Sequence, residues 1–232
     1  MANLCIIPAR GGSKRIPRKN IKPFLGKPII AYSIEAALKS NLFDEVMVST
    51  DDTEIAEIAK KHGAKVPFMR SKKNSDDFAT TMDVLQEVIE SYKKKDQTFE
   101  FVCCIYPCAP LLTVENLLEA FDKLTKNNKK TVFPIIEFSF PIQRALKLED
   151  SNLSFDQPEF ALSRSQDLPK RYHDAGQFYF FRVKTLMEEQ KIIGDSVGAI
   201  VISEMDAQDI DNETDWKLAE IKYQLRKIAR KD

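Results

Sequence analysis

The sequence has no net charge and no long apolar run. Its 232 residues contain 35 Lys and Arg and 35 Asp and Glu. That balance argues against a protein that coats nucleic acid, binds a membrane through a basic patch or carries an acidic tail. No apolar stretch approaches the roughly 20 residues that a membrane-spanning helix needs, and the stretch at 1–8 is too short for a secretion signal. We therefore expect a cytoplasmic protein with no membrane or nucleic-acid partner.

Cysteine and histidine are also scarce, and their spacing excludes a zinc site. Cys103, Cys104 and Cys108 lie in or just after one apolar run and Cys5 lies in another, with no second Cys/His cluster. We expect reduced thiols in buried strands. The two common phosphate-binding motifs, Gly-x-x-x-x-Gly-Lys-Ser/Thr and Gly-x-Gly-x-x-Gly, are absent as well. A nucleotide site in this chain must therefore be built from another kind of loop.

The sequence instead alternates short apolar runs with segments of helical periodicity. Strands are expected at 4–8, 45–50, 99–106, 131–137, 177–183 and 197–202. Helices are expected from about 28, at 53–62, after 80, after 113 and at 213–229. The last has an expected inner face of Leu218, Ile221, Leu225 and either Ile228 or Ala229. This alternation predicts a three-layer α/β fold, in which a mostly parallel sheet carries helices on both faces. Ligands of such folds bind beyond the carboxyl ends of the strands.

The pattern breaks between about 138 and 175. Short irregular pieces with turn-forming residues replace the regular alternation there, but aromatic and apolar residues persist. Persistent apolar residues favour a folded insertion over a linker. We therefore expect a single domain over residues 1–232, with a small lobe inserted at about 138–175.

The strongest signal lies in the loop that follows the first strand. It reads Ala9-Arg10-Gly11-Gly12-Ser13-Lys14-Arg15-Ile16-Pro17-Arg18-Lys19-Asn20. The two glycines can take a positive φ and let the backbone approach an anion closely, and their N–H groups, with that of Ser13, can cradle phosphate oxygens. Arg10, Lys14 and Lys19 add charge that a triphosphate would neutralise. A solvated basic loop is the alternative, but the coincidence of position, glycines and cations favours a nucleoside triphosphate.

Acidic residues collect near the other end of the chain. Residues 206–215 contain five carboxylates and no base. Asp209 and Asp211 stand two apart, so in an extended segment both carboxylates project on one face, and carboxylate oxygens are ligands that Mg²⁺ prefers beside substrate phosphates. The alternative is a solvated helix N-terminus, where acidic residues are favoured anyway. On the residues alone, both interpretations stay open.

The basic loop resembles the nucleotide-binding signature of the sugar-acid cytidylyltransferases. This family includes the N-acylneuraminate cytidylyltransferases and relatives that act on other nine-carbon or eight-carbon keto-sugar acids. Three further stretches are similar to family motifs: Ile-Lys-Pro-Phe-Leu-Gly-Lys-Pro at 21–28, Val-Ser-Thr-Asp-Asp at 48–52 and Gln-Asp-Ile-Asp-Asn-Glu at 208–213. The resemblance covers nearly the whole chain and implies a Rossmann-like nucleotide-diphospho-sugar transferase fold. It also implies a reaction in which the anomeric hydroxyl of a sugar acid attacks the α-phosphate of CTP, with Mg²⁺ bound, and pyrophosphate leaves.

The resemblance assigns residues to CTP and to the metal. Asp209 and Asp211 match the positions that hold the catalytic metal, which we expect to be Mg²⁺. Arg10, Lys19 and Asp211 are the expected catalytic residues, and the general base is either a metal-activated hydroxyl or Asp211 acting through water. The expected nucleotide-binding residues are Ala9, Arg10, Gly11, Gly12, Ser13, Lys14, Lys19, Asn20, Arg70, Ala79, Thr80 and Thr81. Thr80 and Thr81 can equally cap the helix that follows.

The stretches expected at the sugar-acid site depart from the neuraminate enzymes. Those enzymes typically have Gln-Pro-Thr-Ser-Pro-Leu where this chain has Tyr-Pro-Cys-Ala-Pro-Leu at 106–111, and Arg-Pro-Asn-Gly where it has His-Asp-Ala-Gly at 173–176. The second stretch resembles the pseudaminic acid cytidylyltransferases, so we expect pseudaminic acid as the nine-carbon keto-sugar acid. The expected substrate-binding residues are Tyr106, Gln143, Arg144, Arg164, His173, Asp174, Gln177 and Tyr179.

Two alternatives stay open, and one assembly is expected. The acid is N-acetylneuraminic or legionaminic acid in the first alternative. The chain is a catalytically silent nucleotide-binding module in the second, and the retention of Asp209 and Asp211 argues against it. Because the family pairs two chains through such a lobe, we expect a homodimer in which one chain lends basic residues to its partner's substrate site.

Overall fold

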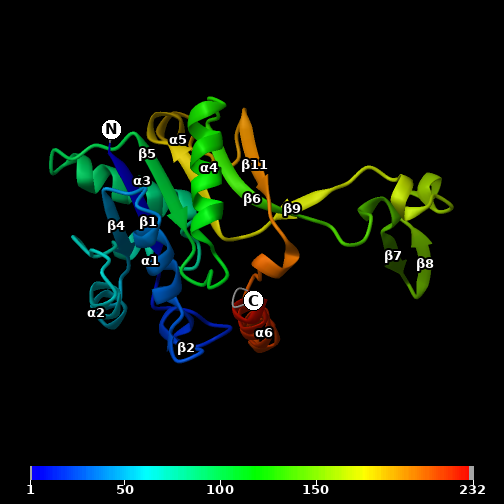
Figure 1. The fold of residues 1–232 in the computed structure, drawn as a ribbon, viewed down its shortest axis with the longest axis horizontal. Helices are drawn as coiled ribbons and strands as arrows, with labels where there is room; N and C mark the ends of the chain where they lie inside the picture. Colours follow the sequence, from blue (N-terminus) through cyan, green and yellow to red (C-terminus); the bar gives the residue numbers. More distant parts are fainter. Residues whose placement is uncertain (1, 230–232) are drawn as a thin grey trace.

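A seven-stranded sheet forms the centre of the computed structural model, which describes residues 2–229 (Figure 1). The strand order is β11-β6-β10-β5-β1-β4, with β9 paired to β6 beside that path. The strands are β1 (Asn3–Pro8), β4 (Glu45–Ser49), β5 (Phe101–Ile105), β6 (Thr131–Glu137), β9 (Tyr172–Asp174), β10 (Phe178–Arg182) and β11 (Val197–Val201). Strands β4, β1 and β5 run parallel to one another, as do β6 and β11, whereas β9 and β10 run antiparallel to their neighbours. The expected mostly parallel sheet is confirmed, with these two exceptions.

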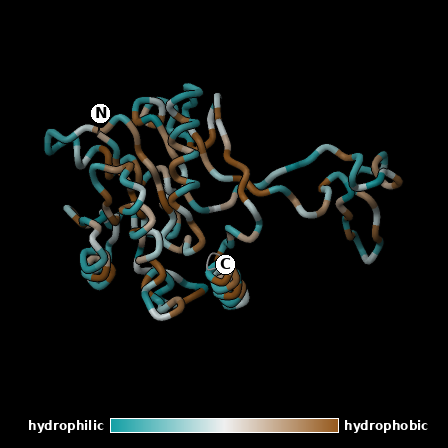
Figure 2. The backbone as a smooth tube through the Cα atoms, in the orientation of Figure 1, coloured by the Kyte–Doolittle hydropathy of each residue, from teal (hydrophilic) through white to brown (hydrophobic). Residues whose placement is uncertain are grey.

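Helices cover both faces of the sheet because side chains alternate along its strands. On β1, Cys5 and Ile7 join one buried cluster, while Leu4 and Ile6 join the other. The first cluster is completed by α1 (Ile30–Lys39), α2 (Thr53–Lys61) and α4 (Val114–Lys126), and the second by α3 (Thr81–Lys93) and α5 (Val183–Glu189). Figure 2 shows hydrophobic residues along the strands between these helices. The three predicted layers are present, although α5 was not predicted because seven residues are too short to display a clear period.

The last helix, α6 (Glu213–Ala229), buries a different face from the one predicted. Trp216 and Ala219 are buried against Phe24 of a small hairpin formed by β2 (Pro23–Phe24) and β3 (Lys27–Pro28). The residues expected to point inward are instead 43–62% exposed, namely Leu218, Ile221, Leu225 and Ile228. The prediction was wrong because this helix carries apolar residues on two faces, and periodicity does not say which face meets the rest of the chain.

Residues 138–171, here called the projection, extend away from the sheet between β6 and β9 (Figure 1). In the projection, β7 (Leu146–Glu149) pairs antiparallel with β8 (Asn152–Phe155), and both strands are exposed along nearly their whole length. The expected lobe reached to about 175, but residues 172–174 form β9 and pair with β6. His173 and Asp174 are therefore carried by the central sheet.

Side-chain caps fix the loops that leave the carboxyl ends of the strands. Asp52 accepts a hydrogen bond from the N–H of Ile55 at 3.0 Å and so caps α2. Thr80 and Asp83 form a reciprocal capping box at the start of α3. These caps set the directions of two loops that border the site described next. None of the helices within residues 2–229 combines the length and the apolar character that a membrane crossing requires.

Candidate active site

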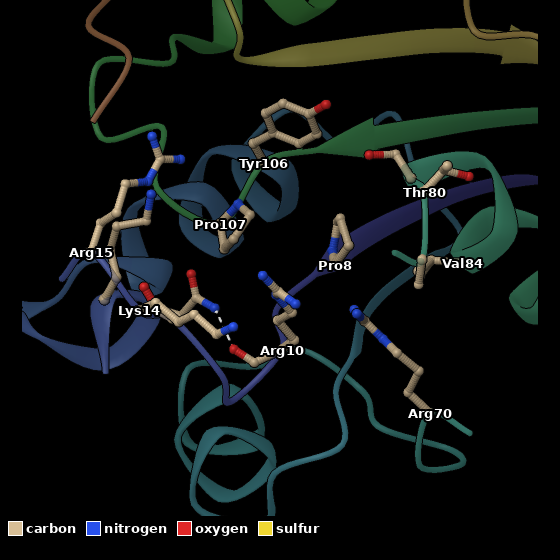
Figure 3. A pocket seen from close by; sticks show the side chains of 14 residues that line it. Pro8, Arg10, Lys14, Arg15, Arg70, Thr80, Val84, Tyr106 and Pro107 are labelled. Carbon is tan, nitrogen blue, oxygen red and sulfur yellow. Dashed lines mark hydrogen bonds between the residues drawn. The ribbon is translucent and has the colours of Figure 1, made fainter. Parts of the chain in front are cut away.

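A cavity of about 450 Å³ lies beyond the carboxyl ends of β1 and β5 (Figure 3). Figure 3 shows the guanidinium groups of Arg10 and Arg70 on one side of the cavity and Tyr106 and Thr80 on the other. The described residues that line it come from separate parts of the chain: Pro8, Arg10, Ser13, Lys14, Arg15, Lys19, Asn20, Arg70, Ala79, Thr80, Thr81, Val84, Tyr106 and Pro107. The loops converge as expected for the carboxyl edge of parallel strands.

Two cations of the basic loop bind the same carboxylate. Nη1 of Arg10 lies 2.8 Å from Oδ1 of Asp77 and donates to the carbonyl of Asp76 at the same distance. Lys14 donates to Oδ2 of Asp77. Hydrogen bonds from Lys14 and Arg10 lower the pKa of the Asp77 carboxyl, so it is anionic at neutral pH. Charge that was predicted to meet phosphate is therefore neutralised here by an acidic side chain.

Gly11 and Gly12 differ from their predicted use. Neither has a positive φ, and the left-handed residue of this loop is Arg18, with a φ of 55°. Gly11 donates its N–H to Oδ1 of Asp51 at 2.9 Å, and a Cβ at position 11 would lie only 2.7 Å from Oδ2 of Asp52. Close approach to Asp52, which itself pairs with Arg18, therefore explains the glycine at position 11. The positive φ that glycine permits is used at neither position.

Lys19 links the basic loop at 9–20 to residues 206–215, here called the acidic segment. Its Nζ donates to the carbonyl of Ile210 at 2.6 Å, a residue that stands between Asp209 and Asp211. On the same side, Nη1 of Arg15 lies 2.6 Å from Oδ2 of Asp211. The basic loop and the acidic segment, which carry opposite charge, thus meet beside the cavity.

Asp209 and Asp211 form an anionic pair that suits a divalent cation. Partial desolvation and the charge of Asp211 raise the pKa of the Asp209 carboxyl, so the site favours a species that reduces negative charge. Residues 2–229 hold no group of three or more His, Cys, Asp or Glu side chains placed for a metal. A cation bound by this pair would take its other oxygens from water and a bound phosphate, which is the usual preference of Mg²⁺. The two carboxylates therefore fit Mg²⁺ together with a phosphorylated ligand, provided that the cation displaces Arg15 from Oδ2 of Asp211.

Arg70 brings a buried positive charge to the cavity wall. The residue is 8% exposed, its Nε donates to Oγ of Ser49 at 3.0 Å and its Nη2 donates to the Ser49 carbonyl at 2.6 Å. Within residues 2–229, Nη1 has no hydrogen-bond partner and no carboxylate pairs with this guanidinium. Burial lowers the pKa of Arg70. The charges of Asp51 and Glu87 offset this burial only in part, so the wall favours a ligand with acceptor atoms.

Behind the cavity wall, Tyr106 packs against the buried Tyr179 of β10. The rings of Tyr106 and Tyr179 lie 5.5 Å apart, and the hydroxyl of Tyr179 donates to Oδ2 of Asp174 at 2.6 Å. Burial raises the pKa of Tyr106, which keeps its hydroxyl protonated. Aromatic surface and an exposed carboxylate lie together here, and that combination suits a ligand with both apolar faces and hydroxyl or amide donors.

Comparison with known proteins agrees with this geometry. Residues 4–221 match the family model described as Cytidylyltransferase. The chain belongs to the cytidylyltransferase family. It is 50% identical over 227 residues to the pseudaminic acid cytidylyltransferase of Campylobacter jejuni, which covers 97% of each chain. It is 32% identical over 240 residues to the CMP-N,N'-diacetyllegionaminic acid synthase of Legionella pneumophila, with 99% of each chain covered.

A solved structure extends the likeness to the fold. The structure of CMP:2-keto-3-deoxy-manno-octonic acid synthetase complexed with CTP has a TM-score of 0.70 and covers 98% of this chain and 99% of its own. At 16% identity it supports the fold alone. The expected family is confirmed, and this cytidylyltransferase is a nucleotidyltransferase with the α/β fold predicted from its sequence.

The cytidylyltransferase cavity brings most of the expected nucleotide-binding residues together. These are Arg10, Ser13, Lys14, Lys19, Asn20, Arg70, Ala79, Thr80 and Thr81. Ala9 is fully buried, while Gly11 and Gly12 are outside the set of described residues that line the cavity. Thr80 lines the cavity and also accepts a hydrogen bond from the N–H of Asp83 at 3.2 Å, so its two proposed roles are compatible.

The expected sugar-acid residues divide into two groups. Tyr106 lines the cavity, and Tyr179 and Asp174 are linked to it as described above. Gln177 lies next to them in sequence but is enclosed, with 2% exposure and a hydrogen bond of 2.6 Å from its Nε2 to the Asp206 carbonyl. His173 packs against the ring of Phe138, and Gln143, Arg144 and Arg164 lie on the projection, away from the cavity of their own chain (Figure 1).

Several residues that contact the loop at 9–20 were not assigned to the site from the sequence, among them Asp77 and Cys108. Asp77 belongs to an adjacent acidic pair inside the polar stretch that precedes Ala79, and this pair was a usable signal. Cys108 was assigned to the buried structural thiols, yet its Sγ lies 3.3 Å from Oδ1 of Asn20. Its sequence position gave no indication of that contact.

Proposed function

We propose that the protein transfers CMP from CTP to the anomeric hydroxyl of pseudaminic acid and releases pyrophosphate in a Mg²⁺-dependent reaction. The observation that carries the proposal is the convergence of Arg10, Lys19 and Arg70 on one cavity beside Asp209 and Asp211. The choice of acid is supported by the Campylobacter jejuni relative named for pseudaminic acid, which is 50% identical over 97% of the chain.

Arg70 supports cytosine as the base. Cytosine presents two adjacent acceptors, O2 and N3, whereas uracil has an N–H donor at position 3. The free Nη1 of Arg70, held by the two bonds to Ser49, matches acceptors and opposes a donor. An unmatched donor pair in a buried site costs binding free energy. We therefore expect CTP to be used in strong preference to UTP.

The basic loop supports the triphosphate. During transfer, the anomeric oxygen forms a bond to the α-phosphorus and the bond from that phosphorus to the bridging oxygen breaks, so negative charge grows on the departing pyrophosphate. Arg10, Lys14 and Lys19 bring positive charge to the cavity. This positive charge stabilises the negative charge that grows on the pyrophosphate in the transition state. Mg²⁺ held by Asp209 and Asp211 would supply further charge neutralisation at the phosphates.

The sugar acid requires groups beyond those of one cavity. Tyr106 offers aromatic surface, supported by the buried ring of Tyr179, and Asp174 offers an acceptor for hydroxyl or amide donors. The carboxylate of the acid needs a cation that these three residues do not provide. Arg144 and Arg164 would supply it from the projection of a second chain.

A homodimer is part of the proposal. The projection exposes Leu146, Leu148 and Leu153 at 52%, 70% and 65%, and a lone two-stranded hairpin is marginal in water. These leucines, and the exposed Leu218, Ile221, Leu225 and Ile228 of α6, provide apolar surface that a second copy of the chain would bury. We also infer that the reaction takes place in the cytoplasm, where free thiols such as Cys5 and Cys103 persist.

A substrate panel tests the reaction. The purified protein is incubated with Mg²⁺, either CTP or UTP, and pseudaminic, N-acetylneuraminic or legionaminic acid, and pyrophosphate release is followed while the CMP-sugar is identified by mass spectrometry. We expect the highest kcat/KM with CTP and pseudaminic acid. Faster turnover of either other acid would contradict the choice of acid. No pyrophosphate release with any pair would contradict catalysis and favour the nucleotide-binding module.

A mixing experiment tests the shared site. One variant carries Arg144→Ala and Arg164→Ala on the projection, and the other carries Asp211→Ala at the metal pair. If the projection serves the partner's cavity, mixed dimers contain one intact site and recover activity that neither variant has alone. If the projection serves its own cavity or chains do not pair, mixing restores nothing. Sedimentation equilibrium of the wild type distinguishes the last two cases.

A further inference from the structure

Cys108 lies where three segments of the site meet. It follows β5, and its Sγ contacts Asn20 of the loop that follows β1. It also packs against the buried cluster that includes Ile16 of that loop and Ile210 of the acidic segment. Of the four cysteines, Cys5, Cys103 and Cys104 are fully buried in the sheet, whereas Cys108 is partly exposed.

Asn20 is held at both ends of its amide. The residue is 7% exposed and lines the cavity. Its Nδ2 donates to the carbonyl of Arg10 at 2.9 Å, and its Oδ1 lies 3.3 Å from Sγ of Cys108. Because the amide nitrogen only donates and the amide oxygen only accepts, a donor at position 108 fixes which end faces Arg10.

The thiol of Cys108 can act as that donor throughout the physiological pH range. Removal of the thiol from solvent raises the pKa of Cys108 to about 12. The nearby charge of Lys19 lowers this pKa and the charge of Asp209 raises it, but burial has the largest effect. The group therefore keeps its proton, and the contact with Asn20 is a thiol hydrogen bond.

We propose that Cys108 is a positioning residue for nucleotide binding: it orients Asn20, and through Asn20 it holds the backbone of Arg10 at the start of the phosphate loop. The inference rests on the proposed binding of CTP. Without a donor at position 108, the amide of Asn20 is free to rotate and its bond to the Arg10 carbonyl is lost for part of the time. The loop then has to be ordered when CTP binds, which weakens binding.

Three substitutions separate the donor from the volume of the side chain. Cys108→Ser keeps a donor, Cys108→Val keeps volume without a donor, and Cys108→Ala removes both. We expect the valine and alanine variants to raise KM for CTP roughly three- to ten-fold, the range for one lost hydrogen bond, with a much smaller change in kcat. The serine variant should retain a KM close to that of the wild type. Cys103→Ala is the matched control, because it removes a thiol from the same strand region without contacting Asn20.

A double-mutant cycle supplies the decisive comparison. Asn20→Ala alone should raise KM for CTP, and adding Cys108→Val to it should cause no further rise, because the residue acts through Asn20. The dissociation constant for CTP, measured by calorimetry with Mg²⁺ present, should follow the same pattern. Additive effects, a serine variant as impaired as valine, or variants with a lower melting temperature but an unchanged KM would each overturn the positioning role.

The proposed function and this inference fail in different ways. If wild-type protein does not bind CTP, the proposed function is wrong. If wild-type protein binds CTP and the Cys108→Val variant binds it equally well, only the role of Cys108 is wrong.

Discussion

Oδ1 of Asp77 lies 2.8 Å from Nη1 of Arg10. The same carboxylate also accepts a hydrogen bond from Lys14. Two cations that we assign to the triphosphate therefore already have an anionic partner on the loop before α3. A bound triphosphate must displace this carboxylate or share the cations with it, and both cost binding free energy.

Asp77→Asn should strengthen nucleotide binding. The substitution removes the competing charge while it keeps the shape of the side chain, so KM for CTP should fall by roughly two- to five-fold, as expected for exposed ion pairs. The difference should shrink at high salt, because exposed charges are screened. Glu57→Gln on α2 is the control, since it removes one exposed negative charge outside the cavity lining. An unchanged or higher KM in Asp77→Asn would mean that Asp77 does not compete with phosphate.

Alanine at the two adjacent glycines should have different effects. In Gly11→Ala the new Cβ would lie 2.7 Å from Oδ2 of Asp52. The melting temperature should therefore fall, and the free energy of unfolding should decrease by about 1–3 kcal/mol. In Gly12→Ala no heavy atom lies within 4 Å of the new Cβ, so the melting temperature should not change. If phosphate approaches the backbone at position 12, KM for CTP should nevertheless rise. Equal melting temperatures for both variants would contradict the clash at Asp52.

The stabilising effect of Asp52 should depend on pH. A hydrogen bond from Arg18 lowers the pKa of Asp52 to about 2, below the ordinary value of about 3.9. A carboxyl whose pKa is lower in the folded than in the unfolded protein stabilises the fold at any pH above its unfolded pKa. This stabilisation is lost as the pH falls towards the folded pKa. Asp52→Asn keeps the cap on α2 but should cost about 1–2 kcal/mol of stability near pH 7, and the cost should diminish as the pH falls from about 4 towards about 2.

Urea unfolding at a series of pH values measures this cost. Asp122→Asn is the control, because Asp122 pairs with Lys126 on an exposed helix surface and its side chain is 60% exposed, where such pairs contribute little. A cost for Asp52→Asn that is constant from neutral to acidic pH would show that the charge of Asp52 does not stabilise the fold.

Loss of either carboxylate of the metal pair should stop turnover and leave the fold intact. Asp209→Asn and Asp211→Asn should each lower kcat at least roughly 100-fold, because several kcal/mol of charge stabilisation are lost with the cation. They should also raise the Mg²⁺ concentration needed for half-maximal activity, with unchanged circular dichroism spectra. Glu213→Gln, two residues further on, should remain active. Normal activity in the Asp variants would contradict metal binding by these residues and would favour their interpretation as solvated charges near a helix N-terminus.

The positions of the cavity and of the sheet strands other than Tyr172–Asp174 could be predicted because local sequence decides them. The strand at Thr131–Glu137 was predicted with its observed ends, since an apolar run bounded by polar residues contains that information. The loops at 9–20 and 106–112 were placed at one edge because parallel strands end there together. Arg10, Lys19 and Arg70 consequently met as expected.

The remaining features depend on contacts between distant segments. The inner face of α6 was decided by Phe24, which packs against Trp216, and by Tyr32, which packs against Tyr223 of the same helix. Position 11 requires glycine because Asp52, 41 positions away in sequence, lies against it. Arg10 pairs with Asp77, which is also distant in sequence. None of these partners is adjacent in sequence, so periodicity and motif spacing do not identify the pairing, although the acidic pair that contains Asp77 marks a candidate.

The position of β10 has a consequence for how the chain folds. This strand lies between β5 and β6 in the sheet, although it follows both in sequence and is separated from β6 by the whole projection. The two halves of the sheet therefore cannot join until Arg182, the last residue of β10, has left the ribosome. Until then β5 presents an unpaired edge, and β6 pairs with β9 but not yet with β10, and an open strand edge promotes aggregation. Fragments that end before β10 should accordingly be insoluble, and refolding should be slowed by this late, long-range pairing.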